Sequence, residues 1–454
     1  MAIVARTLDR IKQDLEPFIP ESSIQAACEE AGYHWRQRVL GPVQTVHLFI
    51  QQVLCFNTAM THLRHLADVV VSASAYCKAR QRLPLAVLQT LLVQSSRAMR
   101  SPDADPSGRW CGLRTYLVDG SSSICPDTDD SQKAFGQPSG CKEGCGFPVP
   151  KVLGLFDAFT GLIVEMLCFP LRTHEQSKVS ALHPLLGKDD LLVGDRGFCS
   201  FAHFAMLFSR GIHGLFRVHQ KQIIDFRPHR KHRTKYEKKR KGAERKKMPR
   251  SKFIKRLGWH DQIVEWYKPQ AKPKWMEKEQ FDALPASLLI RELRYTLARK
   301  GQRTRVVTIA TTLLDPSLYP REKIEALYGV RWRVETHFAQ LKTTLGMRKV
   351  KGHSADVVKK ELAAYALVYN LVHAVMMKAA ERQEVTPDRI SFLDTVRWLL
   401  SAEPGEALPD LIINPHRPDR HEPRVTKDRE DTYTKMTRPR AELTKWLKTQ
   451  GKAA

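Results

Sequence analysis

The segment from Tyr328 to Lys342 constrains the fold of this chain more than any other, because its spacing is that of a two-striped helix. At about 100° per residue, and with Arg331 taken as zero, four apolar residues fall between roughly 280° and 340°. These residues are Val334, Phe338, Leu341 and Leu345. The pattern predicts a helix that buries this stripe against a core.

A polar stripe lies directly beside the apolar one. On the same scale Lys342 falls near roughly 20°, Glu335 near roughly 40° and Tyr328 near roughly 60° from Arg331. A carboxylate flanked by cations suits a metal ion that holds phosphate, with the basic groups and the phenol on neighbouring phosphates. An ordinary Arg–Glu pair four residues apart on a solvated face has the same pattern, so other parts of the chain must decide.

The charge of the chain favours a polyanionic partner. The 454 residues carry a net charge of +26, and the pI is about 9.8. Nucleic acid is the first candidate. Acidic membrane is the competitor, but it requires an amphipathic anchor or a basic segment beside an apolar span. A hydrophobic content of 42% fits a globular protein of two or three domains.

Neither a membrane span nor a disulfide framework is expected. The first ten residues contain charges too early for a signal peptide, and the longest uncharged run, 362–377, includes Asn370 and His373. We therefore expect a buried core helix there and a cytoplasmic, nucleoid-associated protein. The nine cysteines form no CxxC pair, which argues against disulfides and structural zinc.

The spacing of apolar residues divides the chain into five regions. Helical spacing through 24–55 and 83–99 gives way after Trp110 to short β-rich runs. The runs are 113–118, 152–156, 162–169, 191–193, 214–218 and 306–314, with helical stretches at 201–209 and 392–400. Strands followed by helix and strand predict an α/β core with a mixed sheet.

The predicted regions are a helical DNA-binding domain (1–105), the first part of the core (106–220), a basic, mainly β insertion (221–315), the second part of the core (316–380) and a helical, basic C-terminal region (381–454). A plain helical packing domain remains the alternative for 1–105. Dimerisation is a candidate role for 381–454 by position alone.

The insertion contains the strongest concentration of positive charge. Residues 227–256 hold sixteen Lys or Arg against two acids, a net +14. On a chain of this charge the segment is expected to follow a phosphate backbone, although such runs are also simply solvated. Trp259, Trp266 and Trp275 follow, and they are expected to pack a small β subdomain, with stacking on an unpaired base as the alternative.

Two further carboxylates stand where α/β proteins place their chemistry. Asp119 follows the run 115–118 and Asp195 follows 191–194, so both are expected at strand ends. Ligands collect at the carboxyl ends of strands in open sheets. An Asp after a strand is common in turns, but together with Glu335 these residues make three acids that can hold two Mg²⁺ ions.

With these residues the sequence resembles the DDE transposases of bacterial insertion sequences, in the group named for a Tyr-Arg-Glu-Lys signature. The resemblance rests on Asp119-Gly-Ser-Ser, Gly194-Asp195-Arg-Gly-Phe and the spacing of Tyr328, Arg331, Glu335 and Lys342. It covers about residues 110–380.

The resemblance implies an RNase H-like core in which Asp119, Asp195 and Glu335 are the catalytic metal ligands. The cofactor would be two Mg²⁺ ions, with Mn²⁺ as an acceptable substitute. Tyr328, Arg331 and Lys342 would contact phosphates of the transposon end. The activity would be cut-and-paste transposition, with cleavage, a hairpin intermediate and joining to target DNA. The protein would bind terminal inverted repeats as a homodimer in a synaptic complex.

Two other functions remain open at this stage. An RNase H-like nuclease that cleaves without strand transfer would need the same acids. A catalytically inactive DNA-binding regulator would keep the fold, and the presence of all three carboxylates disfavours it.

Overall fold

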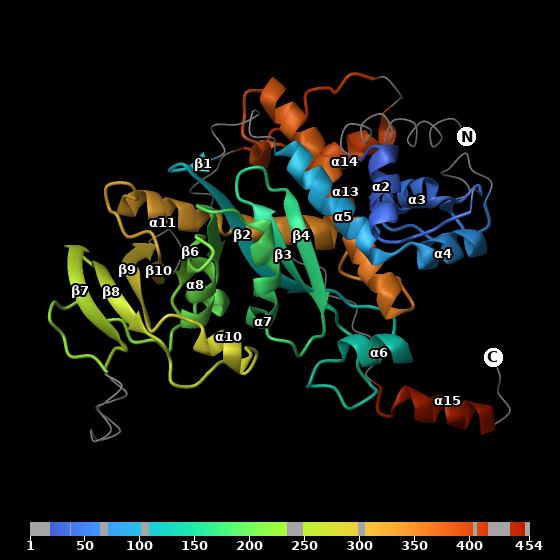
Figure 1. Ribbon diagram of the computed structural model, residues 1–454. Helices are drawn as coiled ribbons and strands as arrows, with labels where there is room; N and C mark the ends of the chain where they lie inside the picture. Colours follow the sequence, from blue (N-terminus) through green and yellow to red (C-terminus); the bar gives the residue numbers. More distant parts are fainter. Residues whose placement is uncertain are drawn as a thin grey trace.

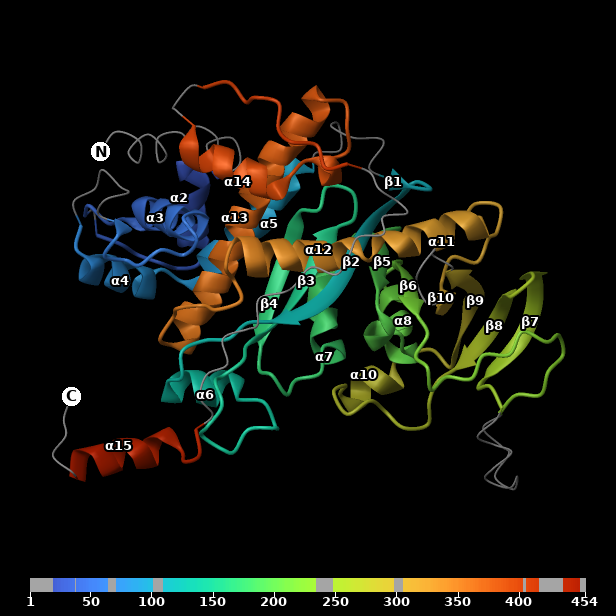
Figure 2. The same ribbon diagram turned by 180° about the vertical axis from the view of Figure 1, so that it is seen from behind.

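One mixed β-sheet with helices on both faces forms the centre of the molecule (Figure 1). The computed structural model describes residues 19–36, 38–63, 71–100, 109–233, 248–297, 305–402, 406–415 and 436–449. The N-terminal helices lie beside one end of the sheet and the strands of the insertion form the other end, as both views show (Figures 1 and 2).

The first half of the sheet has the strand order β4-β3-β2-β5-β6. Its strands are β2 (Leu113–Ser122), β3 (Lys151–Asp157), β4 (Ile163–Phe169), β5 (Leu191–Gly194) and β6 (His213–Arg217). The pairs β2–β3 and β3–β4 are antiparallel, whereas β2, β5 and β6 run parallel. This order and these directions define an RNase H-like core, as predicted. A two-residue strand, β1 (Arg109–Trp110), pairs with β2.

The insertion is mainly β, as predicted, and it continues the core sheet. Its strands are β7 (Ser251–Gly258), β8 (Asp261–Tyr267), β9 (Ser287–Leu297) and β10 (Arg305–Thr311), and a short helix, α10 (Lys278–Asp282), precedes β9. All neighbours in this half are antiparallel, and β10 pairs with β6 of the core. The insertion is therefore held to the core by backbone hydrogen bonds.

Successive side chains of β2 point into two hydrophobic cores, one on each face of the sheet. Leu117 belongs to the core on one face, and Tyr116 and Val118 belong to the core on the other. The first face is covered by α5 (Leu85–Met99) and α13 (Ala355–Arg382). The second face is covered by α7 (Gln176–Val179), η3 (Ser180–Leu185) and α8 (Phe201–Phe208). The sheet is therefore packed between two layers of helices, which fix the positions of its strand ends.

The long helix α13 is buried as the sequence predicted. Among the described helices it alone has the length and hydropathy to cross a membrane, and 89% of its most apolar window is buried inside the protein. Its Asn370 side chain donates to the carbonyl of Ile163 (2.7 Å) and accepts from the amide of the same residue (2.8 Å). A buried polar residue thereby satisfies the backbone at the start of β4.

The N-terminal region is helical and is joined to the core through polar contacts. Its helices are α2 (Glu21–Glu30), α3 (Pro42–Leu54), α4 (Ala73–Arg82) and α5. The basic and aromatic residues near Trp35 lie in the connection between α2 and α3. Asn57 donates to the buried carboxylate of Glu361 in α13 (2.6 Å), and Arg80 lies 3.8 Å from the same carboxylate.

Beyond α13, the chain forms η6 (Pro387–Arg389), α14 (Phe392–Ser401) and α15 (Arg440–Thr449). The predicted helix over 392–400 corresponds to α14. The N-terminus of α15 packs near α6 (Asp129–Phe135), and the rest of α15 extends away from the molecule (Figures 1 and 2).

Candidate active site

Two aspartates meet at one edge of the sheet. The parallel ladder between β2 and β5 ends with the pair Val118 and Gly194, so the residues that follow, Asp119 and Asp195, are neighbours. The expectation that Asp119 lies at a strand end is wrong, because β2 continues to Ser122 through its pairing with β3. Asp119 follows only the end of the parallel pairing with β5. A short helix, η4 (Arg196–Phe198), begins after Asp195.

The third carboxylate projects from a helix packed over the same sheet. This region comprises α11 (Arg321–Val330), α12 (Arg333–Ala339) and the π-helical turn η5 (Gln340–Thr344). The four residues of the predicted apolar stripe are all buried. The side chain of Glu335 is 56% exposed. The helix therefore buries one stripe and presents Glu335, as its sequence predicted.

The helix is less regular than predicted. The α-helix is interrupted between α11 and α12 at Arg331 and Trp332, and the π turn follows Ala339. In that turn the amide of Leu345 bonds to the carbonyl of Gln340, five residues back. A helical wheel drawn at a uniform roughly 100° per residue therefore does not give the correct direction of Lys342, which lies in the π turn.

Arg331 links two of the three carboxylates. Its Nη1 atom lies 3.3 Å from Oδ2 of Asp119, and its Nη2 atom lies 3.4 Å from Oε1 of Glu335. The guanidinium carbon lies 4.7 Å from the centre of the Trp332 ring. The side chain of Arg331 is only 7% exposed. The site thus contains a buried cation between an aspartate on the sheet and a glutamate on the helix.

The electrostatic environment of Asp119 disfavours its ionised form. The pKa of Asp119 is raised to about 6, chiefly by burial and to a smaller extent by the charges of Asp195 and Glu175. The hydrogen bond from the Gly120 amide (2.8 Å) and the charge of Arg331 lower the pKa, but burial is the larger effect. Burial therefore biases the Asp119 carboxyl towards its protonated form.

Glu175 is a fourth carboxylate that the sequence analysis did not identify. It precedes α7, its carboxylate lies 3.5 Å from Nζ of Lys151, and it packs over Gly120. A Cβ atom at Gly120 would lie 2.6 Å from the Glu175 carboxylate, so a larger residue after Asp119 would require the Glu175 side chain to move. No local sequence pattern connects residues 120 and 175.

Tyr328 and Lys342 are less exposed than phosphate contacts would be. Tyr328 is 3% exposed, its hydroxyl has no hydrogen-bond partner among the described residues, and burial raises its pKa. Lys342 lies in η5, where burial and then the charge of Arg348 lower the pKa of its amine. Their contacts with DNA remain predictions.

The donor atoms at this site fit a magnesium ion in kind. Asp119, Asp195 and Glu335 supply carboxylate oxygens, which Mg²⁺ prefers. Two of them already share one cation, the Arg331 guanidinium. Within the described ranges, however, no three His, Cys, Asp or Glu side chains converge closely enough to hold a metal ion. In this arrangement the Arg331 guanidinium lies between two of the three predicted metal ligands.

A basic and aromatic recess lies in the insertion. It has a volume of about 470 Å³, and its walls include Phe226, Arg256, Trp259, His260 and Arg294. Trp259 is 72% exposed, and the Arg256 guanidinium lies 5.8 Å from the centre of its ring. Sequence reasoning identified Trp259, but no local pattern indicated that Phe226 and Arg294 would join it.

The three tryptophans of the insertion have different environments. Trp266 is buried and donates to Glu292 (2.8 Å), and Trp275 packs partly buried against a small apolar cluster. Trp259 alone of these is largely exposed. The expectation that they pack the subdomain is confirmed for Trp266 and Trp275 and is wrong for Trp259.

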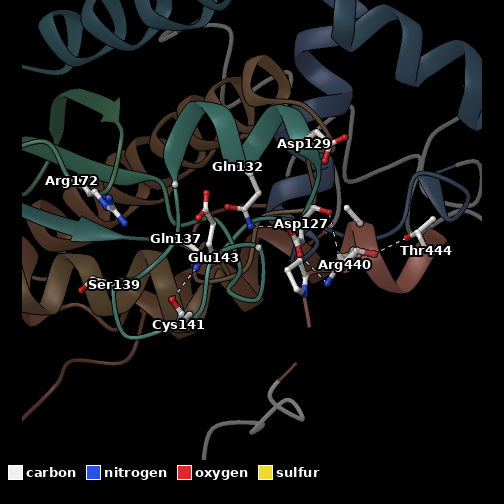
Figure 3. A pocket seen from close by; sticks show the side chains of 14 residues that line it. Asp127, Asp129, Gln132, Gln137, Ser139, Cys141, Glu143, Arg172, Arg440 and Thr444 are labelled. Atoms are coloured by element: carbon white, nitrogen blue, oxygen red, sulfur yellow. Dashed lines mark hydrogen bonds and ion pairs between the residues drawn. The ribbon is translucent and has the colours of Figure 1, made fainter. Parts of the chain in front are cut away.

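A second cavity lies away from the three carboxylates. It has a volume of about 890 Å³ and lies between the loop around Asp127 and the start of α15 (Figure 3). Arg440 forms an ion pair with Asp127 across it (2.8 Å), and Thr444 lies farther along the helix. None of Asp119, Asp195 and Glu335 contributes to its walls.

Comparisons with known proteins indicate the family of this chain. Residues 110–371 match the family described as "Transposase DDE domain". The chain is 25% identical over 383 residues to the Escherichia coli (strain K12) protein "Transposase InsG for insertion sequence element IS4", with 80% of this chain and 78% of that protein covered. A cryo-EM structure of a piggyBac transposase synaptic complex with hairpin DNA aligns with a TM-score of 0.42 and 11% identity, covering 87% of this chain and 80% of that one.

Proposed function

This chain belongs to the DDE transposase family, and from that premise we propose that it recognises the terminal inverted repeats of an insertion sequence, cuts there and joins the ends to new DNA. The family membership makes it a DNA-transposing enzyme. Binding to inverted repeats, the hairpin intermediate and the use of a metal ion are our proposals beyond family membership.

One observation carries the proposal. Asp119 and Asp195 are neighbours at the end of the parallel ladder, and Arg331 links Asp119 to Glu335 on the overlying helix. Two of the acids that we propose to be catalytic therefore lie at one edge of the sheet, and the third lies on the other side of the Arg331 guanidinium from Asp119. A carboxyl with a strongly raised pKa beside a specific charged partner, as at Asp119, is typical of functional sites.

The chemistry we propose is a series of phosphoryl transfers. Water attacks a phosphodiester and nicks one strand, and the freed 3′-hydroxyl attacks the opposite strand to close a hairpin. A second water opens the hairpin, and the 3′-ends then join target DNA. In each step one P–O bond forms as another breaks, so no external energy source is needed. Two Mg²⁺ ions held by Asp119, Asp195 and Glu335 would stabilise the attacking and leaving oxygens.

Cations around the site would hold the DNA backbone. We assign Arg331 and Lys342, together with the phenol of Tyr328, to phosphates of the transposon end, which requires Tyr328 and Arg331 to become more accessible than they are here. The basic segment 227–256 would follow the backbone farther away, and its central part, 234–247, lies outside the described residues. The helical region 1–105 would contribute to end recognition.

The recess around Trp259 extends this surface. It presents an exposed indole beside two arginines, Arg256 and Arg294, on a strongly basic chain. Stacking on aromatic side chains combined with positive charge is how proteins bind unpaired bases. We assign this recess to an unpaired nucleotide of the DNA.

We also propose that the protein acts as a homodimer that holds two transposon ends, and that it works in the cytoplasm on the nucleoid. The C-terminal region 381–454 is the candidate dimerisation element by its position.

The direct test uses DNA from the ends of the element that encodes this chain. Wild type and Glu335→Ala would be incubated with labelled end duplex, Mg²⁺ and a supercoiled target, and the products resolved on a denaturing gel. Nicks, hairpins and joined products are expected with wild type and should vanish with Glu335→Ala. Glu322→Ala, which removes an exposed carboxylate from the neighbouring helix α11, is the matched control and should behave as wild type.

The other outcomes distinguish the alternatives. Cleavage without joined products would indicate a nuclease that lacks strand transfer. Specific end binding by wild type without any cleavage would indicate an inactive regulator.

A further inference from the structure

Arg331 lies between two of the carboxylates that we propose as metal ligands. Its guanidinium contacts Asp119 at 3.3 Å and Glu335 at 3.4 Å, and it is buried against the Trp332 ring. A divalent cation shared by those two carboxylates would have to take the same space and the same negative charge. Arg331 and the metal therefore compete.

Arg331 is held loosely for a buried arginine. Both contacts exceed the 2.7–2.9 Å that is usual between such charged groups. Its Nε atom is buried and has no hydrogen-bond partner among the described residues. A buried donor without a partner costs roughly 1–3 kcal/mol. The present arrangement of Arg331 is therefore one that a better acceptor, such as a phosphate, could replace.

We propose that Arg331 is a switch that makes metal loading depend on DNA. In the free protein its guanidinium stands in for the metal between Asp119 and Glu335. When DNA binds, a phosphate draws the guanidinium away and the two carboxylates become available to the metal. This inference rests on the function proposed above, and it adds a second role to a residue that would otherwise only grip the backbone.

Thermodynamic linkage gives the proposal its measurable content. If DNA binding frees the carboxylates, then DNA must tighten metal binding, and metal must tighten DNA binding by the same factor. Removing the guanidinium should abolish most of that coupling, because the carboxylates would then be available at all times. The free protein should hold metal more tightly as a result.

The experiment measures Mn²⁺ binding by calorimetry, with and without end duplex, in the absence of turnover. The proteins are wild type, Arg331→Ala and Arg331→Gln, which keeps a polar side chain of similar reach without the charge. Arg333→Ala is the matched control, because Arg333 lies two residues farther along the chain, at the start of α12, and pairs with Asp388 (3.1 Å) instead. Folding of each variant is checked by thermal unfolding.

We expect both Arg331 variants to bind Mn²⁺ about tenfold more tightly than wild type without DNA, within the range usual for coupled sites. End duplex should tighten Mn²⁺ binding to wild type and to Arg333→Ala, with little further effect on the Arg331 variants. Equal or weaker Mn²⁺ binding by both Arg331 variants, or an unchanged effect of DNA, would overturn the proposal.

A further pair of variants separates this inference from the proposed function. Asp119→Asn and Glu335→Gln should lose the DNA-dependent Mn²⁺ site. If they bind Mn²⁺ as wild type does, the metal site itself is wrong. If they lose it while the Arg331 variants match wild type, only the switch is wrong.

Discussion

Two buried arginines, Arg291 in the insertion and Arg331 at the candidate active site, each pair with an aspartate, and the two pairs are built differently. Arg291 on β9 holds Asp261 on β8 through two bonds, of 2.9 and 2.6 Å, and a third bond of 2.7 Å reaches the carbonyl of Tyr319. Arg331 makes only two long contacts, to Asp119 and Glu335. The first pair is saturated and the second is not.

The difference separates a structural pair from a functional one. Arg291 joins two strands of the insertion to the segment that precedes α11, and both it and Asp261 are almost fully buried. Nothing is left for a ligand to bind. Arg331 has an unpartnered Nε atom, and one of its carboxylates, Glu335, is half exposed. Incomplete satisfaction of buried charge is common where a site awaits a partner.

Breaking the saturated pair should produce the largest change in stability. Arg291→Ala leaves the Asp261 carboxylate buried without its partner, so we expect the free energy of unfolding to fall by about 3–5 kcal/mol. Urea unfolding followed by circular dichroism measures this.

A double-mutant cycle provides the control. Adding Asp261→Ala to Arg291→Ala removes the stranded charge, so the double variant should recover part of the loss. Additive losses from the two substitutions would mean that the pair is not coupled. The comparison with Arg331 would then have no basis.

At the candidate site, the raised pKa of Asp119 should make the free energy of unfolding depend on pH. Burial raises the pKa of Asp119 from its ordinary 3.8 to about 6. Between those values the folded protein keeps a proton that the unfolded chain has lost. Stability should therefore fall as the pH rises through this window, by up to about 3 kcal/mol, and this group adds no further change above it.

The measurement compares wild type with Asp119→Asn in urea from pH 4 to pH 7 without metal. The variant cannot titrate at this position, so the difference between the two curves isolates Asp119. A flat difference would show that Arg331 already compensates the carboxylate, and the contrast between the two pairs would weaken.

The two tryptophans of the β7–β8 hairpin should repeat the contrast on a smaller scale. Trp266 is buried and bonded, whereas Trp259 is 72% exposed beside Arg256. Trp259→Ala should weaken binding to DNA with an unpaired nucleotide by about 1–3 kcal/mol while the melting temperature stays the same. Fluorescence anisotropy with paired and unpaired duplexes measures the effect.

Phe208→Ala is the matched control, because Phe208 is an aromatic residue of α8 that is 62% exposed. It should leave DNA binding unchanged. Equal weakening by Trp259→Ala for paired and unpaired DNA would argue against base stacking in the recess.

Much of the site could be predicted because it depends on local patterns. The strand before each aspartate is a short apolar run, and parallel strands place their ends at one edge, so Asp119 and Asp195 were expected to be neighbours. The apolar stripe that docks the Glu335 helix follows from spacing alone. These features are set by neighbours in sequence.

The remainder depends on contacts between distant segments. The π turn after Ala339 lies where Tyr369 of α13 contacts both His337 (2.7 Å) and Gln340 (3.3 Å). The position of Glu175 over Gly120 and the pairing of β10 with β6 also join residues far apart in the chain. A sequence pattern contains no information on such pairs, so neither the irregular helix nor the extra carboxylate was predicted.

The smallest expected effect concerns Lys342, which tests whether the site has a second phosphate-binding cation besides Arg331. Its amine is half buried in η5, and burial lowers its pKa. If it contacts a phosphate, Lys342→Ala should reduce the slope of log binding constant against log salt by about 1, because one fewer counterion is released. Lys323→Ala, an exposed lysine of α11, is the control. Titrations of labelled end duplex at several salt concentrations measure both slopes. An unchanged slope for Lys342→Ala would place that amine away from the DNA backbone. Arg331 would then be the phosphate-binding cation that we propose at this site.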